Sequence, residues 1–370
     1  MSDRVAIVGA GTTPPRPLSP DQSFREMTFA AAARAYEDAG VSHRDIDSFI
    51  SVCEDFHEGT SITDEYVPDQ LGAVLRPVQT IAGDGIQGIA TAFMLIRSGI
   101  ADVVAVEAHA KSSNILRHDE VLAMGLDPVY ERPLGVNPHY VAAMEMRRYL
   151  HDSGRTDTAV ADVVVENRRR ALGNPIAPYG AVLTAADVLA AALVSEPLRA
   201  SMISAYADGA VVLVLASEER AEAALRPVWI RGIGWSSDTS ALSMRDWATA
   251  TYAALATAMA YQMAGIERPA DELAFAEVDD TYAHKQLQHL DAARLTAPGG
   301  EPLVPVNRSG GSLGMGYCYD ASALYRTAEA VRQIRGEAGR NQVPGATTGL
   351  VLSWRGVPTQ TGGALVLGDH

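Results

Sequence analysis

The stretch AGDGIQG, residues 82–88, decides the fold class, because this glycine-rich turn leads directly into an apolar helix pattern, IATAFMLIRSG (89–99). A second glycine-rich turn, SGGSLGMG (309–316), precedes a segment in which we expect a helix through Ala330. The same unit therefore occurs twice in one chain. This repetition predicts two related halves.

Strands and helices flank the two turns in the same order. Each half begins with a strand, continues with a small-residue helix that ends at Gly40 or Gly265, and then reaches another strand. The predicted strands are residues 5–9, 45–52, 101–110 and 208–217 in the first half, and 228–234, 273–280, 349–354 and 361–368 in the second. Apolar strands that alternate with helices are typical of α/β proteins whose sheets are covered by helices on both faces.

The two halves, residues 1–225 and 226–370, differ by one long insertion. About a hundred residues, 111–207, separate two predicted strands of the first half, which is far more than a connection requires. Their pattern is helical, as in NPHYVAAMEMRRYL (137–150). We expect this inserted segment to cap a functional site.

Composition excludes several classes of function. The 370 residues are 47% hydrophobic and 20% charged, which is sufficient for a large core. A net charge of −15 without a cluster of Lys and Arg disfavours nucleic acid as a partner. No apolar run is long enough to span a membrane and no targeting pattern is present at the start, so we expect a cytoplasmic protein. The two cysteines, Cys53 and Cys318, lack the spacing of a disulfide framework or zinc site, so we expect both in the core and no metal site.

Five stretches carry a family resemblance. They read AARAYEDAGVSHRDID (32–47), ALGNPIAPYG (171–180), SEPLRASMISAYADGAVVLVLASEE (195–219), AEVDDTY (276–282) and NRSGGSLGMGYCYDA (307–321). In them the chain resembles the sterol-carrier-protein-X type of thiolase and its lipid-transfer-protein relatives. The resemblance implies the thiolase fold, an α/β architecture of two duplicated βαβ-rich halves stacked as an αβαβα sandwich, with the helical insertion in the first half.

The sequence departs from this family where the catalytic residues would lie. A thiolase has a nucleophilic cysteine at the N-terminus of the first central helix, where the helix dipole lowers the thiol pKa. Gly85 occupies that place here, and Tyr317 replaces the histidine base of the family's Gly-His-Pro motif. The second cysteine motif is also absent, and Gly363 stands in its region. The glycine turns remain, so we expect changed chemistry without an acyl-enzyme.

A further substitution suggests what the changed chemistry is. The resemblance places a His-Asp pair at the end of a second-half strand, where the sequence has Asp279 and Asp280, with Tyr282 two places on. A pocket with backbone donors aimed at a thioester oxygen stabilises an enolate as well as a tetrahedral oxyanion. A retro-aldol cleavage in such a pocket needs two groups that move protons, and no nucleophile.

The chain is similar in this respect to the thiolase-like aldolases of bacterial steroid side-chain catabolism. The resemblance implies a carbon–carbon lyase that cleaves a β-hydroxyacyl-CoA thioester, with a steroid side chain as its acyl part, to a ketone and a shortened acyl-CoA such as propionyl-CoA. It implies that Tyr282 and Tyr317 move the two protons, with base and acid not assigned. The supporting candidates are Asp279, His284, Tyr319 and Asp84, and the turns expected to bind the thioester contain Gly85, Gly88, Gly310, Gly311 and Gly363.

The resemblance also implies partners. We expect a homodimer that forms through the edge strand at residues 78–81, and a zinc-ribbon/OB-fold accessory protein that completes a heterotetramer. The CoA thioester is expected as substrate, and no tightly bound cofactor is expected.

Each candidate residue also has a structural interpretation. Tyr282 and Tyr319 each have the alternative role of a core aromatic side chain whose hydroxyl has a hydrogen-bond partner. Asp279, together with Asp280, is also explained by a strand-end turn, and Asp84 by a favourable charge at a helix N-terminus. His284 belongs either on the surface or behind the site. The functional rivals of the lyase are an acyltransferase, for which the missing cysteine is an obstacle, and a non-catalytic subunit that binds acyl-CoA or lipid.

Overall fold

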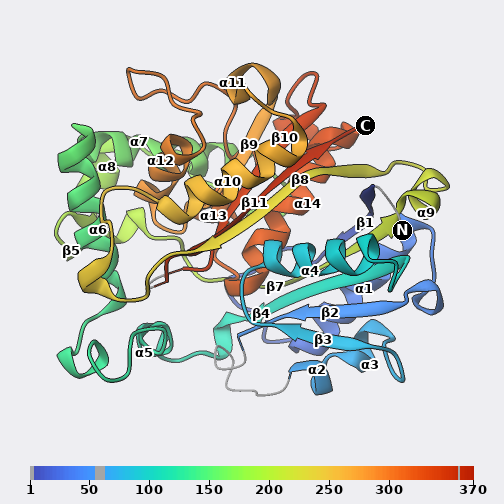
Figure 1. Ribbon diagram of the computed structural model, residues 1–370. Helices are drawn as coiled ribbons and strands as arrows, with labels where there is room; N and C mark the ends of the chain where they lie inside the picture. Colours follow the sequence, from blue (N-terminus) through green and yellow to red (C-terminus); the bar gives the residue numbers. More distant parts are fainter. Residues whose placement is uncertain (1–3, 55–62, 357–358) are drawn as a thin grey trace.

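The computed structural model describes residues 4–54, 63–356 and 359–370, which form two half-sheets and their covering helices (Figure 1). The strand order is β3-β2-β4-β7-β1-β8-β11-β10-β9. The first half supplies β1 (Val5–Thr12), β2 (Ser48–Val52), β3 (Val78–Ile81), β4 (Val103–Lys111) and β7 (Asp208–Ser217). The second half supplies β8 (Val228–Ser237), β9 (Phe275–Val278), β10 (Thr348–Trp354) and β11 (Thr361–Gly368).

Two helices lie between the half-sheets. Helix α4 (Gly85–Arg97) contacts β2 and β4 of the first half and β11 of the second, and α14 (Ser322–Arg335) contacts β9 and β10 as well as β1 and β7. Helix α1 (Phe24–Ala39) covers the outer face of the first half-sheet, and α10 (Thr251–Ala264) covers that of the second. The layers therefore alternate as αβαβα, which confirms the predicted sandwich.

The two half-sheets are joined edge to edge. Ala6 pairs with Trp229, and Ile7 pairs with Val228, across β1 and β8. Strand twist accumulates across the nine strands, and α4 and α14 pack against strands of both halves. The sandwich is therefore one curled sheet wrapped around α4 and α14.

The predicted elements are present, although the ends of several strands differ by one to three residues and one predicted helix is divided. The strand predicted from residue 45 begins at Ser48, because His43–Asp45 form a short 3-10 helix capped by the Ser42 hydroxyl. The helix predicted after the second glycine-rich turn is divided into α13 (Gly311–Met315) and α14. The division leaves a non-helical segment in the middle of the predicted site.

The break between α13 and α14 has a local cause. Gly316 adopts φ 98°, a conformation that favours glycine, and it ends α13. The Tyr317 N–H then donates to the Ala205 carbonyl at 2.8 Å, and the Tyr317 carbonyl accepts from the Ala207 N–H at 3.0 Å. The inserted segment therefore holds the backbone of Tyr317 in place.

The inserted segment is mainly helical, as predicted. It forms α5 (His118–Ala123), α6 (Pro138–Ser153), α7 (Asp157–Ala171), α8 (Ala185–Ala190) and a two-stranded sheet of β5 (Leu193–Ser195) and β6 (Leu198–Arg199). Helix α7 packs against α13 and against α12 (Ala283–Ala292) of the second half. The insertion therefore covers the elements that follow β9 and the second glycine-rich turn.

Two negative findings hold for the described part of the chain. None of its helices combines the length and the apolar character that are needed to cross a membrane. Its acidic, cysteine and histidine side chains nowhere gather in a group of three that could hold a metal ion.

Candidate active site

Tyr282 and Tyr317 lie at the ends of two second-half elements. Tyr282 follows β9 as the residue before α12, and Tyr317 lies in the break between α13 and α14. Both side chains are almost fully buried, with exposed fractions of 2% and 4%. The hydroxyl oxygen of Tyr282 lies 2.8 Å from Nδ1 of His139, at the start of α6.

Tyr317 belongs to a group of tyrosines. Its ring centroid lies 5.1 Å from that of Tyr319 and 5.9 Å from that of Tyr206. Tyr319 has φ 44°, which is uncommon for a residue with a side chain and marks a locally constrained backbone. The group therefore joins two residues of the break after α13 to one residue of the inserted segment.

A second histidine completes this aromatic cluster. Nδ1 of His118 lies 2.7 Å from the Tyr319 hydroxyl oxygen, and its ring stacks on Tyr206 with centroids 3.5 Å apart. The aromatic cluster has two parts, which are Tyr282 with His139, and Tyr206, Tyr317 and Tyr319 with His118. Electrostatic interactions of Tyr282 with Tyr206 and Tyr319 link the two parts. The sequence interpretation missed the two histidines and Tyr206, although all three lie in the segment predicted to cap the site. Their position in the inserted segment was the only feature of the sequence that could have identified them.

Burial keeps every member of the cluster uncharged. It raises the pKa of the Tyr282 and Tyr317 phenols well above the ordinary value of 10.0. It lowers the pKa of His118 and His139 from 6.5, although Asp119 opposes the shift in both. At neutral pH the site therefore presents neutral phenols and neutral imidazoles, and Nδ1 of each imidazole lies within hydrogen-bond distance of a tyrosine hydroxyl.

Asp279 and Asp280 follow β9 and are buried. Asp279 forms an ion pair with Arg326 at 2.6 Å, and it also accepts the Thr281 N–H at 2.9 Å, which is the predicted strand-end turn. Asp280 accepts the Ser312 N–H at 2.6 Å, at the start of α13. Burial, opposed mainly by Arg326, raises the pKa of Asp280 to about 6. Both carboxylates are used to hold neighbouring elements together.

The glycines of the second turn permit this arrangement. A Cβ atom at Gly311 would lie 2.1 Å from an Asp280 carboxylate oxygen, and one at Gly310 would lie 2.7 Å from Cβ of Ala171. Both glycines have positive φ values, 99° at Gly310 and 61° at Gly311. They allow the close approach of Asp280 and of α7 to α13.

The first glycine-rich turn has no room for a nucleophile at its centre. A Cβ atom at Gly85 would lie 2.6 Å from Cγ of Leu324 and 2.9 Å from the backbone nitrogen of that residue. A Cβ atom at Gly88 would lie 2.3 Å from Val52, and one at Gly363 would lie 2.6 Å from Ile86. These glycines allow α4 to pack closely on its neighbours. At the place where the resemblance implies the thiolase cysteine, the space beside Gly85 is filled by Leu324 of α14.

Asp84 caps α4. Its Oδ1 accepts the Ile86 N–H at 2.8 Å, and its Oδ2 accepts the Ser353 hydroxyl at 2.5 Å. Burial is the main cause that raises its pKa to about 6. Asp279 interacts electrostatically with both Asp84 and Tyr317, so the start of α4 lies within electrostatic range of the aromatic cluster. The capping role predicted as one interpretation of Asp84 is present.

His284 does not lie on the surface, and that alternative is wrong. Its side chain is fully buried, because α6, α7 and α10 surround α12. Its Nε2 lies 3.1 Å from Glu145 of α6, and Nζ of Lys285 lies 3.1 Å from the same carboxylate. Although burial raises the pKa of Glu145, attraction by Lys285 and His284 lowers it overall. The three residues form a charged cluster behind Tyr282, whose ring centroid lies 6.1 Å from that of His284.

Neither cysteine is placed as a nucleophile. Cys53 and Cys318 are both buried, and burial raises the pKa of the Cys318 thiol. A thiol in such a place carries little thiolate, which is the reactive form. The predicted packing of both cysteines in the core is confirmed.

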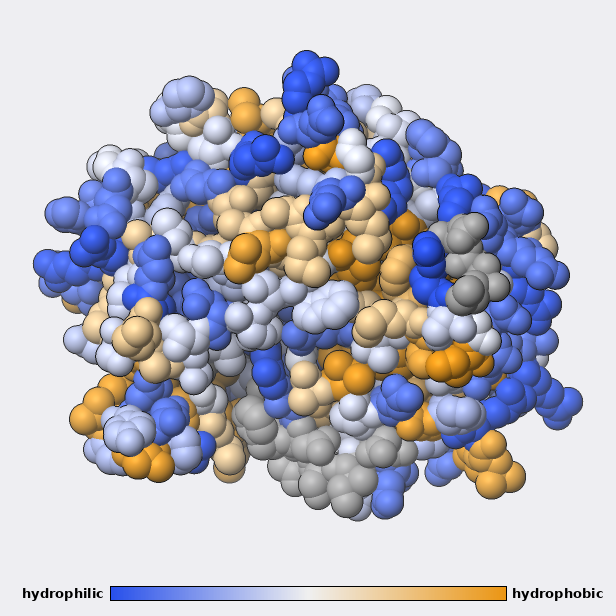
Figure 2. Space-filling view, viewed as in Figure 1, coloured by the Kyte–Doolittle hydropathy of each residue, from blue (hydrophilic) through white to orange (hydrophobic). Residues whose placement is uncertain are grey.

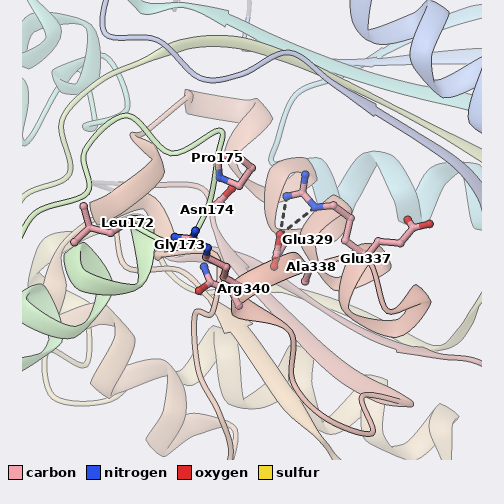
Figure 3. A pocket seen from close by; sticks show the side chains of 11 residues that line it. Leu172, Gly173, Asn174, Pro175, Glu329, Glu337, Ala338 and Arg340 are labelled. Atoms are coloured by element: carbon pink, nitrogen blue, oxygen red, sulfur yellow. Dashed lines mark hydrogen bonds and ion pairs between the residues drawn. The ribbon is translucent and has the colours of Figure 1, made fainter.

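A separate cavity of about 390 Å³ lies between the end of α7 and the end of α14 (Figure 3). Asn174, Arg340 and Glu329 are among the residues that line it, and Glu329 is paired with Arg332 at 2.6 Å. No member of the aromatic cluster lines this cavity. Its connection to the site is Asn174, whose side-chain amide donates to the Ser309 carbonyl of the second glycine-rich turn.

Comparison with known proteins finds similarity to thiolase-related proteins along nearly the whole chain. Residues 234–369 match the family described as "Thiolase C-terminal domain-like". The chain is 29% identical to an acetyl-CoA acetyltransferase of Methanothermobacter thermautotrophicus, over 94% of each protein. It is 28% identical to a 17-hydroxy-3-oxo-4-pregnene-20-carboxyl-CoA lyase of Mycobacterium tuberculosis, over the full length of both.

A solved structure is also similar to this chain. A chain of the structure described as "Ltp2-ChsH2(DUF35) aldolase" is 26% identical and superimposes with a TM-score of 0.83, over all of this chain and 98% of that one. The predicted resemblance and the thiolase fold are confirmed by these matches.

Proposed function

Because its C-terminal part belongs to the thiolase C-terminal domain-like family and the whole chain has the thiolase fold, we propose that this protein is a thiolase-like aldolase. It is a carbon–carbon lyase that cleaves a β-hydroxyacyl-CoA thioester without a covalent intermediate. The observation that carries the proposal is the aromatic cluster, in which the Tyr282 hydroxyl lies beside His139 and the Tyr317 ring lies beside Tyr319, whose own hydroxyl lies beside His118. Similarity to the mycobacterial lyase supports it.

The proposed reaction uses these phenols as proton carriers. A base removes the proton of the substrate's β-hydroxyl group, the Cα–Cβ bond breaks, and a ketone and a thioester enolate form. An acid then protonates the enolate carbon. A buried phenol is a suitable acid for a carbanion, because its pKa lies far above neutral pH but far below that of a carbon acid. Tyr282 and Tyr317 share the two roles.

The substrate that we propose is a CoA ester of a steroid side chain, which gives a steroid ketone and a shortened acyl-CoA such as propionyl-CoA. The support is the name of the mycobacterial relative, a lyase of a pregnene carboxyl-CoA. No tightly bound cofactor is required by this chemistry.

The main competing function is acetyl transfer, which the similarity to the archaeal acetyltransferase favours. That chemistry in a thiolase proceeds through a cysteine acyl-enzyme. Here position 85 is glycine and its Cβ direction is filled by Leu324. The geometry of this site therefore favours the lyase.

The proposed assembly is a homodimer that also binds a zinc-ribbon/OB-fold protein. Strand β3 lies at the edge of the sheet, and such an edge offers its free N–H and C=O groups to a second strand. The side chains of Leu255, Met259 and Met263 on α10 are exposed. In Figure 2, which has the orientation of Figure 1, apolar surface extends across the middle of the molecule. The name of the similar solved complex, which includes a DUF35 component, supports the accessory partner.

A product assay tests the proposal. The protein, alone and co-expressed with an OB-fold protein, is incubated with a β-hydroxyacyl-CoA of a steroid side chain, and ketone and acyl-CoA are followed by mass spectrometry. Acetyl transfer from acetyl-CoA is measured in parallel. Stoichiometric ketone and shortened acyl-CoA are expected. Acetoacetyl-CoA formation without any ketone release would support the acetyltransferase, and binding of acyl-CoA without either product would support a non-catalytic subunit.

A further inference from the structure

His139 occupies a position in which an imidazole is held uncharged. It lies in the first turn of α6, where the Asn137 side chain caps the helix by accepting the His139 N–H at 2.8 Å. The N-terminal end of a helix carries a partial positive charge, which disfavours an imidazolium. Burial acts in the same direction and lowers the pKa of His139 from 6.5. The titratable groups that face this ring are Tyr282, before α12, and Asp119 on α5, which opposes the shift.

The hydrogen bond between His139 and Tyr282 joins a phenol to an imidazole nitrogen. When the imidazole hydrogen is on Nε2, Nδ1 is the acceptor and the Tyr282 hydroxyl is the donor, and this is the tautomer that a proton relay requires. A phenol in this state is a poor base by itself, because deprotonating it in a buried site is costly. It becomes a base when its own proton can leave at the same moment.

We infer that His139 is the positioning residue that accepts the phenol proton of Tyr282, so that this tyrosine removes the proton of the substrate's β-hydroxyl group. The inference rests on the proposed function and assigns the two roles left open there. The proton donor to the enolate is then Tyr317, the other buried phenol of the proposed pair.

The proposed cleavage conserves protons and electron pairs. The β-hydroxyl proton moves to the Tyr282 oxygen as the Tyr282 proton moves to Nδ1 of His139. The electron pair of the broken O–H bond forms the ketone C=O, and the Cα–Cβ pair becomes the enolate. The enolate carbon takes the Tyr317 proton. The imidazolium of His139 and the phenolate of Tyr317 return to neutrality when one proton is transferred between them through solvent.

The inserted segment therefore has a second task beside covering the site. It carries His139 on α6, while Tyr282 belongs to the second half of the chain, and the two residues are 143 positions apart. Packing of the inserted segment against α12 would therefore bring His139 to Tyr282 and so form the pair that acts as the base. A relative that lacks a basic residue at this place in α6 would have to activate its tyrosine in another way.

The substitution His139→Asn tests the inference, because an amide oxygen still accepts a hydrogen bond from the phenol but does not accept its proton. We expect kcat to fall by about 10² to 10³, within the usual contribution of a positioned base, with little change in KM. Wild-type kcat should fall on the acid side with a midpoint below 6.5, as His139 takes up a proton, and this acid limb should be absent from the variant. The control is His151→Asn on the same helix, whose ring is exposed.

The double variant with Tyr282→Phe separates a relay from two independent effects. Residues that act as one unit lose activity together, so the double variant should be no slower than Tyr282→Phe alone. An unchanged acid limb in His139→Asn, or losses that multiply in the double variant, would overturn the inference.

A measurement without turnover keeps this test distinct from that of the proposed function. Nitrogen NMR of ¹⁵N-histidine-labelled protein at pH 7.5 should show one histidine with an unprotonated, hydrogen-bonded Nδ1 that changes in Tyr282→Phe and disappears in His139→Asn. Protonation of that Nδ1 at this pH would overturn the relay. If the spectrum is as expected but the protein releases no ketone, the proposed lyase function is contradicted. The hydrogen bond between His139 and Tyr282 is then still supported.

Discussion

The hydroxyl of Ser353 donates a 2.5 Å hydrogen bond to Oδ2 of Asp84, and this contact joins β10 of the second half to the first turn of α4 in the first. The contact is fully buried, and burial is the main cause of a folded-state pKa of about 6 for Asp84, against 3.8 when the carboxyl is unperturbed. The folded state therefore holds the proton more tightly than the unfolded state does.

The first prediction concerns this carboxyl. Because its folded pKa is raised, Asp84 lowers stability as pH rises from about 4 to about 6, and its effect is constant above that window. In Asp84→Asn that contribution is removed. The stability of the variant relative to wild type should therefore increase across the window, by on the order of 1 to 3 kcal/mol. Urea unfolding at pH 4 and pH 7 measures the difference, and a relative stability that is flat or decreases with pH contradicts it.

The second prediction concerns the two phenols. Tyr282→Phe removes one hydrogen bond and should lower the free energy of unfolding by about 1 to 2 kcal/mol, and Tyr317→Phe should lower it by less. Turnover should fall by roughly 10² to 10⁴ in each variant, because each removes a proton carrier. Melting temperature and rate of ketone release are measured on the same samples. Turnover within a few-fold of wild type in both well-folded variants would leave the tyrosines as packing residues.

The third prediction is that cysteine chemistry is not used. Cys53→Ser and Cys318→Ser, singly or together, should keep most of the activity, and iodoacetamide should inhibit little, because both thiols are buried. Mass spectrometry reports the alkylation beside the rate. Complete loss of turnover in a folded Cys318→Ser protein would indicate that Cys318 is a nucleophile, and the lyase mechanism would be rejected.

The fourth prediction asks whether the thiolase nucleophile can be put back. Gly85→Cys would bring its Cβ against Leu324, so α4 and α14 must separate or strain. We expect a loss of about 1 to 3 kcal/mol in stability, the usual cost of overpacking, and no thiolytic activity. The cost should be smaller in a double variant with Leu324→Ala than the two single costs added together. A stable Gly85→Cys protein with acetyl-CoA acetyltransferase activity would show that the site remains a thiolase site.

The fifth prediction is dimerisation through the β3 edge. Light scattering of the purified protein should give twice the mass of the 39.2 kDa chain. A stable monomer, alone and with the OB-fold partner, contradicts the prediction.

Part of the site could be predicted because it lies beside local signals in the chain. Asp84 directly precedes a helix whose glycine-rich start is visible in the sequence, and it caps that helix. Tyr282 and Tyr317 follow a predicted strand and a predicted turn, so their place at the ends of elements could be inferred. The break between α13 and α14 was not visible, because it depends on the pairing of Tyr317 with Ala205 and Ala207 of the inserted segment.

The other part of the site is made of long-range pairs. His118 and Tyr319 are 201 positions apart, and neither histidine of the cluster is marked by a motif. The sequence left His284 either on the surface or behind the site, because its burial depends on Glu145 and on the helices that surround α12. No periodicity within α12 reveals which distant charge lies opposite a side chain.

The sequence by itself determined the duplicated strand–turn–helix order, the glycine positions and the lack of a cysteine at residue 85, because these depend on near neighbours along the chain. Only the tertiary structure decided that one sheet curls around α4 and α14, that Leu324 fills the space beside Gly85, and that the insertion brings imidazoles to the phenols. The physical reason is that a backbone pattern is set by local sterics and hydrogen bonding. The partner of a buried polar side chain is set by the packing of elements far apart in the sequence.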